Sequence, residues 1–195
     1  MKRLVAITGG IGSGKSVVSA VLRIMGYPVY DCDSNAKRLM DDSASIKVSL
    51  AKTFGREVVA GGVIDRRLLA SIVFNDPAAL GRLNAIVHPA VVADVFRWRD
   101  SRQDGIVFVE TAILRESGLL RVVDGVVLVM ADEAVRIHRV MKRNGLSEKE
   151  VRERIASQGG GGSGFAELPV YILHNSGDKA LLPQISSFLN AFSRD

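Results

Sequence analysis

A glycine-rich segment at residues 9–16 restricts the fold of this chain more than any other part of the sequence. It reads Gly-Gly-Ile-Gly-Ser-Gly-Lys-Ser and matches the pattern G-x-x-x-x-G-K-[ST] in full. An apolar run over Arg3–Thr8 precedes it, as in a buried parallel strand. After it, Val18, Val21, Leu22 and Met25 follow helical spacing. The order of strand, tight loop and helix predicts a phosphate-binding loop in an α/β fold.

Each part of this loop suits a nucleoside triphosphate. Glycines let the backbone wrap round a phosphate with its N–H groups pointing inward, and the next helix adds its positive N-terminal end. We expect Lys15 to reach the β- and γ-phosphates and the Ser16 hydroxyl to help hold Mg²⁺. The alternative is a glycine-rich turn that only joins the strand to the helix. The predicted nucleotide-binding residues of the loop are Gly10, Ile11, Gly12, Ser13, Gly14, Lys15 and Ser16.

Acidic side chains follow two other predicted strands. Asp31 and Asp33 follow residues 28–30, at the carboxyl edge where open α/β sheets bind ligands. Asp33 is a candidate base or positioning carboxylate, and because it precedes a helix it is also a candidate N-cap. Glu110 follows the apolar run 106–109 and either orients Mg²⁺-bound water or caps the next turn.

The remaining pattern alternates helices with buried strands. Asp76-Pro77 is typical of a helix start, and His88-Pro89 should end or kink that helix. Ser147 and Glu150 form a predicted capping box, whereas residues 159–164, Gly-Gly-Gly-Gly-Ser-Gly, predict a loop. The expected elements are a mainly helical stretch from 34 to about 102, strands at 106–109, 126–130 and 170–173, and helices at 133–144, 147 to about 158, and 181–192.

Composition indicates an ordinary soluble globular protein. The chain has 195 residues, 47% of them hydrophobic and 24% charged, with a net charge of +5. We find no apolar run of the roughly 18–20 residues that a membrane helix needs, and no signal peptide. Cys32 is the single cysteine, which excludes a disulfide framework and favours the cytosol.

Basic residues gather in two groups. Arg97, Arg99 and Arg102 form the first, and Arg136, Arg139, Lys142 and Arg143 form the second. Both are either solvated helix faces or contacts for a polyanionic ligand. Lys142 and Arg143 end a predicted helix, so they either close on phosphates or stabilise the negative end of the helix dipole. Aromatic residues make up only 6% of the chain, which argues against a base-stacking nucleic-acid surface.

Several segments resemble one family of P-loop kinases. Residues 83–89, Leu-Asn-Ala-Ile-Val-His-Pro, are the most diagnostic, because a generic nucleotide kinase has no reason to carry them. Together with residues 8–16, 28–33, 66–74, 110–119, 143–147 and 175–177, they are similar to motifs of the dephospho-coenzyme A kinases, in the family's order.

The resemblance implies transfer of the γ-phosphoryl group of ATP to the ribose 3′-hydroxyl of dephospho-coenzyme A, the last step of coenzyme A synthesis. It implies one P-loop kinase domain: a core with a parallel five-stranded sheet at about 1–33, 104–140 and 169–195, a helical acceptor lobe at about 34–103, and a lid at about 141–168. Asp33 matches the family's proposed base, and Arg143 matches a lid residue facing the phosphates. The acceptor is expected at Asp33, Arg66, His88, Pro89 and Leu114, the nucleotide also at Lys142 and Asn175, and Mg²⁺ at Ser16 and Glu110.

Two departures from the family pattern leave rival readings open. Glu110 and Ala112 replace the usual Asp and Pro, and residues 159–164 replace a charged helix. The rivals are a P-loop kinase for another hydroxyl acceptor and an ATP-binding protein with impaired activity. The expected partners are small molecules, namely ATP and dephospho-coenzyme A. We expect binding neither to nucleic acid nor to a membrane, and we favour a monomer.

Overall fold

The computed structural model describes residues 2–74, 76–157, 165 and 168–192 of the chain. The chain divides into two compact units. The sheet unit comprises Met1–Tyr30, Gln103–Leu114 and Leu120–Asp195, and the helical unit comprises Asp31–Arg102 and Arg115–Leu119. The predicted loop at residues 159–164 lies outside the described residues.

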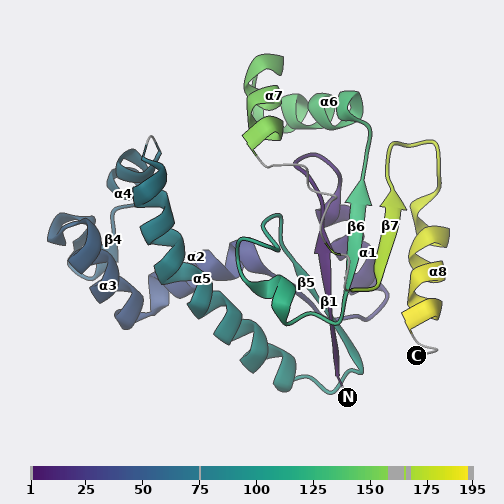
Figure 1. The fold of residues 1–195 in the computed structure, drawn as a ribbon, viewed down its shortest axis with the longest axis horizontal. Helices are drawn as coiled ribbons and strands as arrows, with labels where there is room; N and C mark the ends of the chain where they lie inside the picture. Colours follow the sequence, from purple (N-terminus) through teal and green to yellow (C-terminus); the bar gives the residue numbers. More distant parts are fainter. Residues whose placement is uncertain (1, 75, 158–164, 166–167, 193–195) are drawn as a thin grey trace. The chain divides into compact units, whose positions relative to one another are not determined.

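The sheet unit is built on a five-stranded sheet in the order β2-β5-β1-β6-β7 (Figure 1). β1 pairs in parallel with β5 on one side and with β6 on the other, and β6 pairs in parallel with β7. The predicted α/β class is confirmed. The strands are β1 (Arg3–Thr8), β2 (Val29–Asp31), β5 (Ile106–Glu110), β6 (Gly125–Met130) and β7 (Val170–His174).

The order places β1 at the point where the chain turns from one half of the sheet to the other. In open α/β sheets, ligands bind at the carboxyl ends of the strands beside such a point. The loop at residues 9–14 leaves β1 at this edge. The helices of the sheet unit are α1 (Lys15–Ile24), α6 (Glu133–Asn144), α7 (Glu148–Ser157) and α8 (Leu181–Phe192). A short 3₁₀ turn, η2 (Leu119–Arg121), begins at the last residue of the helical unit and ends in the sheet unit.

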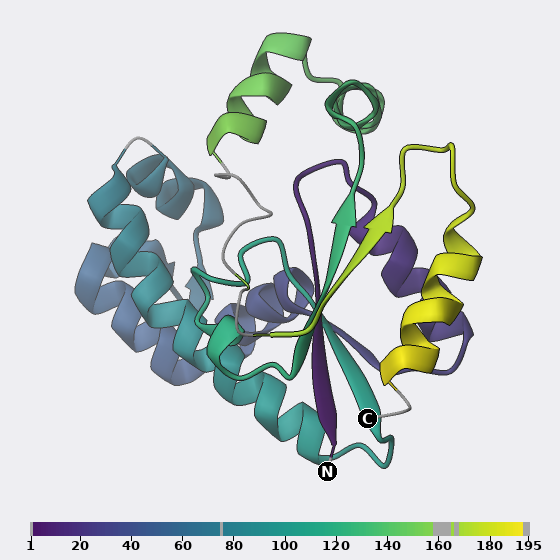
Figure 2. The same ribbon diagram turned by 45° about the vertical axis from the view of Figure 1, so that its right-hand side comes forward.

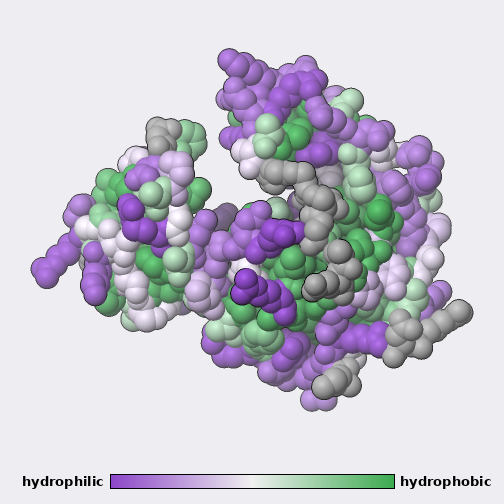
Figure 3. Space-filling view, viewed as in Figure 1, coloured by the Kyte–Doolittle hydropathy of each residue, from purple (hydrophilic) through white to green (hydrophobic). Residues whose placement is uncertain are grey.

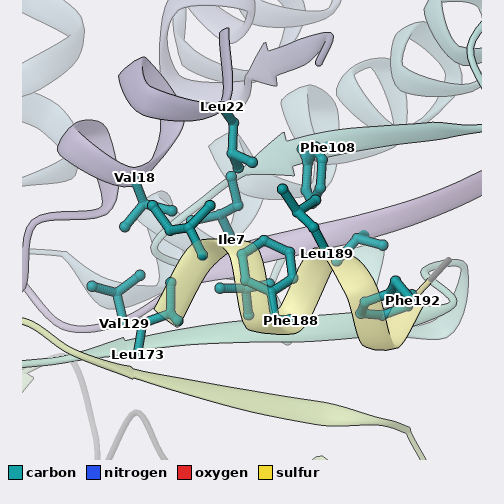
Figure 4. Close-up of a cluster of buried hydrophobic side chains, with 12 residues drawn as sticks. Ile7, Val18, Leu22, Phe108, Val129, Leu173, Phe188, Leu189 and Phe192 are labelled. Carbon is teal, nitrogen blue, oxygen red and sulfur yellow. The ribbon is translucent and has the colours of Figure 1, made fainter. Parts of the chain in front are cut away.

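One face of the sheet is covered by α1 and α8, which lie side by side (Figure 2). Their apolar residues enclose the main core together with inward side chains of the strands (Figure 4). Phe188 lies at its centre, edge-on to Phe108 at 6.1 Å between ring centroids and tilted against Tyr171 at 6.2 Å. The buried members are Val5, Ile7, Val18, Leu22, Phe108, Val127, Val129, Leu173, Ile185, Phe188, Leu189 and Phe192.

The helical unit contains a small hairpin that the sequence analysis did not predict. Its strands are only two residues long and carry no alternation that separates them from a helical stretch. Its elements are α2 (Cys32–Asp42), α3 (Ala44–Phe54), the 3₁₀ turn η1 (Arg56–Val58), the antiparallel strands β3 (Val59–Ala60) and β4 (Val63–Ile64), α4 (Arg66–Val73) and α5 (Pro77–Asp100).

Helix α5 corrects two expectations. It continues through Pro89 as one helix of 24 residues, so His88-Pro89 does not end it, and the alternative of a kink stays a prediction. By length and composition it also qualifies as a candidate membrane span, although the sequence was expected to contain no such run. One such helix is weak evidence for a membrane, because the core helix of a soluble protein passes the same test. Here α5 contacts α2, α3 and α4, with Val87, Val91 and Val95 buried.

Truncating Phe188 tests the main core. Because its ring is 3% exposed and contacts two other rings, Phe188→Ala should lower the free energy of unfolding by about 3–5 kcal/mol. Leu182→Ala is the matched control, since Leu182 lies on the same helix and is 60% exposed; its change should stay within about 0.5 kcal/mol. Urea denaturation measures both. Equal losses in the two variants would contradict this assignment of the core.

Candidate active site

The phosphate loop joins β1 to α1 at the centre of the sheet. Gly14 is the N-cap of α1 and has φ of 98°, and Gly12 has φ of 77°; both values favour glycine. At Gly12 a side chain would also meet the backbone oxygen of Arg136, 2.6 Å from an ideal Cβ. The two glycines therefore meet a conformational and a steric requirement of the turn.

The carbonyl groups of the loop accept hydrogen bonds from side chains around it. Lys15 Nζ donates to Gly9 O at 2.7 Å and to Gly10 O at 3.2 Å. Arg136 Nε donates to Ile11 O at 2.9 Å, and Arg139 Nη1 contacts Gly12 O at 3.4 Å. Asn175 Nδ2 donates to Ser13 O at 2.8 Å, and the backbone N–H groups of Val17 and Val18 donate to Gly14 O. Every carbonyl from residue 9 to residue 14 thus accepts a hydrogen bond.

Ser13 contributes a buried hydroxyl to the loop. Its side chain is 1% exposed, and among the described residues its Oγ has no hydrogen-bond partner. Its backbone N–H donates to Gly10 O at 3.2 Å, which closes the turn. A buried hydroxyl without a partner is unusual and is often explained by a group that the structure does not contain.

The two residues predicted for Mg²⁺ lie at the same edge of the sheet. Ser16 is exposed in the first turn of α1, and Glu110 is the half-buried last residue of β5, in register with Ile7 of β1. Hydroxyl and carboxylate oxygens fit a hard cation that keeps several waters and binds phosphate oxygens. In the part of the chain that the structure describes, no group of three or more His, Cys, Asp and Glu residues is arranged to hold a metal. The Ser16 hydroxyl and the Glu110 carboxylate are therefore oxygen ligands of the kind that Mg²⁺ binds.

Helices α6 and α7 pack against the phosphate loop through one apolar cluster. Ile137 and Val140 of α6 and Val151 of α7 are buried in it, and Ile11 of the loop packs against them. The outer surface of these helices is largely hydrophilic (Figure 3). The predicted capping box is confirmed, because Ser147 N and Oγ donate to Glu150 at 2.8 and 2.6 Å. These bonds hold the pKa of the Glu150 carboxyl below its ordinary value.

Lys142 and Arg143 lie in the last turn of α6, as predicted, and both are exposed. Arg143 Nε donates to the side chain of the adjacent Asn144 at 2.8 Å. Among the described residues, the bonds from α6 to the phosphate loop come from Arg139, about one turn earlier, and Arg136, about two turns earlier. A role for Lys142 and Arg143 at phosphates stays a prediction.

In the helical unit, Asp31 rather than Asp33 caps helix α2. The Asp31 carboxylate accepts from the backbone N–H of Asp33 at 3.0 Å and of Ser34 at 3.1 Å. The N-cap reading of Asp33 is therefore wrong, because β2 runs to Asp31 and α2 begins one residue later. Asp33 lies exposed in the first turn, where its carboxylate has no capping role.

Besides Asp33, four residues are expected to face the acceptor: Arg66, His88 and Pro89 lie in the helical unit, and Leu114 lies in the sheet unit. In the helical unit, Arg66 Nη2 pairs with Asp41 Oδ1 at 2.8 Å, His88 Nδ1 lies 3.0 Å from Glu116 O, and Pro89 is exposed within α5. In the sheet unit, Leu114 is 2% exposed and packs in the core. Contact of these four residues with an acceptor stays a prediction.

Arg136 and Arg139 have a structural role that was not expected from the sequence. Both belong to the basic group expected to face solvent or a polyanion, whereas in the structure both donate to carbonyls of the phosphate loop. Their spacing of three residues, with apolar Ile137 and Val140 beside them, could have indicated a face turned toward the protein.

Comparisons with known proteins agree with this geometry. A family model described as dephospho-CoA kinase matches residues 3–179. A dephospho-CoA kinase of Porphyromonas gingivalis is 41% identical over 154 residues, covering 79% of this chain and 76% of the relative. One of Bacteroides fragilis is 37% identical over 182 residues, covering 93% of this chain and 88% of the relative.

Solved structures share the fold over the whole length. A structure from Thermus thermophilus superposes with a TM-score of 0.80 at 37% identity, covering 99% of this chain and 97% of that one. A shikimate kinase of Acinetobacter baumannii shares the fold with a TM-score of 0.55 at 11% identity, covering 100% and 94% of the two chains. With its complete phosphate loop, its strand order and its match over residues 3–179, this chain belongs to the dephospho-CoA kinase family.

Proposed function

We propose that this chain transfers the γ-phosphoryl group of ATP to the ribose 3′-hydroxyl of dephospho-coenzyme A, giving coenzyme A and ADP. The observation that carries the proposal is the family match over residues 3–179 in a chain whose phosphate loop is complete. The resemblance of residues 83–89 to the family favours this acceptor over another hydroxyl.

The proposed step gives each expected site residue a separate role. In the sheet unit, the loop N–H groups and Lys15 bind the phosphates, and Arg143 neutralises charge on the transferring group. In the helical unit, the Asp33 carboxylate accepts the proton of the 3′-hydroxyl as its oxygen bonds to the γ-phosphorus and the bond to ADP breaks. Arg66, His88 and Pro89 orient the acceptor.

We propose Mg²⁺ as the metal, held with the nucleotide by the Ser16 hydroxyl and, through water, by Glu110. When bound, it neutralises charge on the phosphate oxygens. We also propose that the protein works in the cytoplasm, since its single cysteine suits a reducing compartment. We further propose that it acts as a monomer and that its partners are small molecules.

An acceptor panel tests the proposed activity. The protein is incubated with ATP and Mg²⁺ together with dephospho-coenzyme A, adenosine, shikimate or other hydroxyl acceptors, and ADP formation is measured. We expect phosphorylation of dephospho-coenzyme A alone. Transfer to another acceptor would support a different kinase, and ATP binding without transfer would support a protein that has lost activity.

Removing the Lys15 ammonium tests the phosphate site. We expect Lys15→Ala to lower kcat by roughly 10²–10³-fold, because the ammonium stabilises charge on the phosphates during transfer. Lys15 Nζ donates to Gly9 O and Gly10 O within the loop, and its side chain is not part of the buried apolar core, so the melting temperature should change little. Near-normal turnover in this variant would contradict the assignment.

Substitutions of the neighbouring residues Asp33 and Asp31 distinguish a catalytic carboxylate from a helix-capping one. Asp33→Asn should lower kcat by about 10²–10⁴-fold with little change in ATP affinity, because the amide cannot accept the proton. Asp31→Asn is the matched control: asparagine caps a helix nearly as well, so stability and kcat should both stay close to wild type. Steady-state kinetics and thermal melts measure these effects. An unchanged kcat in Asp33→Asn would exclude it as the base.

A further inference from the structure

Arg136 makes a long-range contact to the phosphate loop that the proposed mechanism does not use. It lies one turn into α6, half-buried, and its Nε donates to Ile11 O at 2.9 Å across 125 positions of sequence. Of the two arginine contacts that α6 makes with the loop, this one is the shorter, since Arg139 Nη1 lies 3.4 Å from Gly12 O.

The bond fixes the orientation of one peptide group of the loop. In a planar trans peptide the carbonyl and the following N–H point in opposite directions, and no described peptide bond is cis. Because Ile11 O points toward Arg136, the N–H of Gly12 points away from α6. A phosphate loop binds its ligand through N–H groups turned in this manner.

Close packing keeps the arginine in place. An ideal Cβ on Gly10 would meet the guanidinium of Arg136, and one on Gly12 would meet its backbone oxygen at 2.6 Å. The neighbouring Ile137 is buried in the cluster that also includes Ile11. Backbone, guanidinium and apolar neighbours of Arg136 therefore all lie against the loop, and α6 is attached to it at this point.

We infer that Arg136 is a positioning residue for the ATP site: its Nε–H holds the peptide between Ile11 and Gly12 with the Gly12 N–H available to a phosphate. This inference rests on the proposed function for the identity of the ligand. Arg136 acts through its hydrogen bond to the loop backbone. Its positive charge is not required for ATP binding.

Two substitutions separate the hydrogen bond from the charge. Gln places its Nε2 at the position of the Arg Nε, one bond beyond Cδ, so Arg136→Gln keeps a donor and removes the charge. Arg136→Met has similar length and neither donor nor charge. Arg23→Met is the matched control, because Arg23 Nη2 also bonds to a backbone carbonyl, Val29 O at 3.4 Å, but on α1 away from the loop.

Binding of ATP without any acceptor measures the effect. We expect Arg136→Met to weaken ATP binding about five- to tenfold, in line with the loss of one partly buried hydrogen bond. Arg136→Gln should recover affinity to within about twofold of wild type, and Arg23→Met should leave it unchanged. At saturating ATP, kcat of Arg136→Met should stay within about threefold of wild type, because the residue does not contact the reacting atoms.

Three results would overturn the inference. The first is ATP binding by Arg136→Met within twofold of wild type. The second is an Arg136→Gln variant as weak as Arg136→Met, which would assign the effect to charge on the phosphates. The third is an equal loss in Arg23→Met. A wild-type chain that binds ATP but does not phosphorylate dephospho-coenzyme A would refute only the proposed activity, because the binding experiment contains no acceptor.

Discussion

The orientation of the backbone between residues 9 and 14 is the constraint on which the rest of the site depends. A loop that presents N–H groups to an anion must turn its carbonyls outward, and a buried carbonyl without a donor is costly. Here the donors come from three different elements: Lys15 of α1, Arg136 and Arg139 of α6, and Asn175 after β7. The loop conformation is therefore a property of the folded sheet unit rather than of the glycines alone.

The strand order explains how these donors meet. Because β1 pairs with both β5 and β6, the loop that follows it emerges at the middle of the sheet, with β6 and β7 on one side. The chain leaves β6 into α6 and leaves β7 into Asn175, so both segments start at the same edge as the loop. Asn175 N also donates to Met130 O at 2.7 Å, which ties the ends of these two strands together.

The helices and strands that the sequence predicts correctly are mostly those defined by a local pattern of apolar residues. Residues 3–8 and 133–144 match β1 and α6 because apolar runs and helical periodicity fix such elements over short distances. The cap of α2 was misplaced from Asp31 to Asp33, because a strand that passes directly into a helix leaves no loop to mark the boundary. The loop contacts of Arg136 and Arg139 could not be predicted, because they join residues 125 and 127 positions apart.

The connection between the loop and α7 depends on apolar packing more than on charge. Arg152 pairs with Glu133 of α6 at 2.6 Å and with Glu148 of α7 at 2.7 Å, but all three side chains are more than half exposed. Such exposed pairs contribute little and weaken with salt. The buried contact of Val151 with Ile137 and Val140, and of these with Ile11, is what joins α7 to the loop. The loop at Ile11 and both helices therefore share one apolar cluster, and the exposed ion pairs add little to the connection.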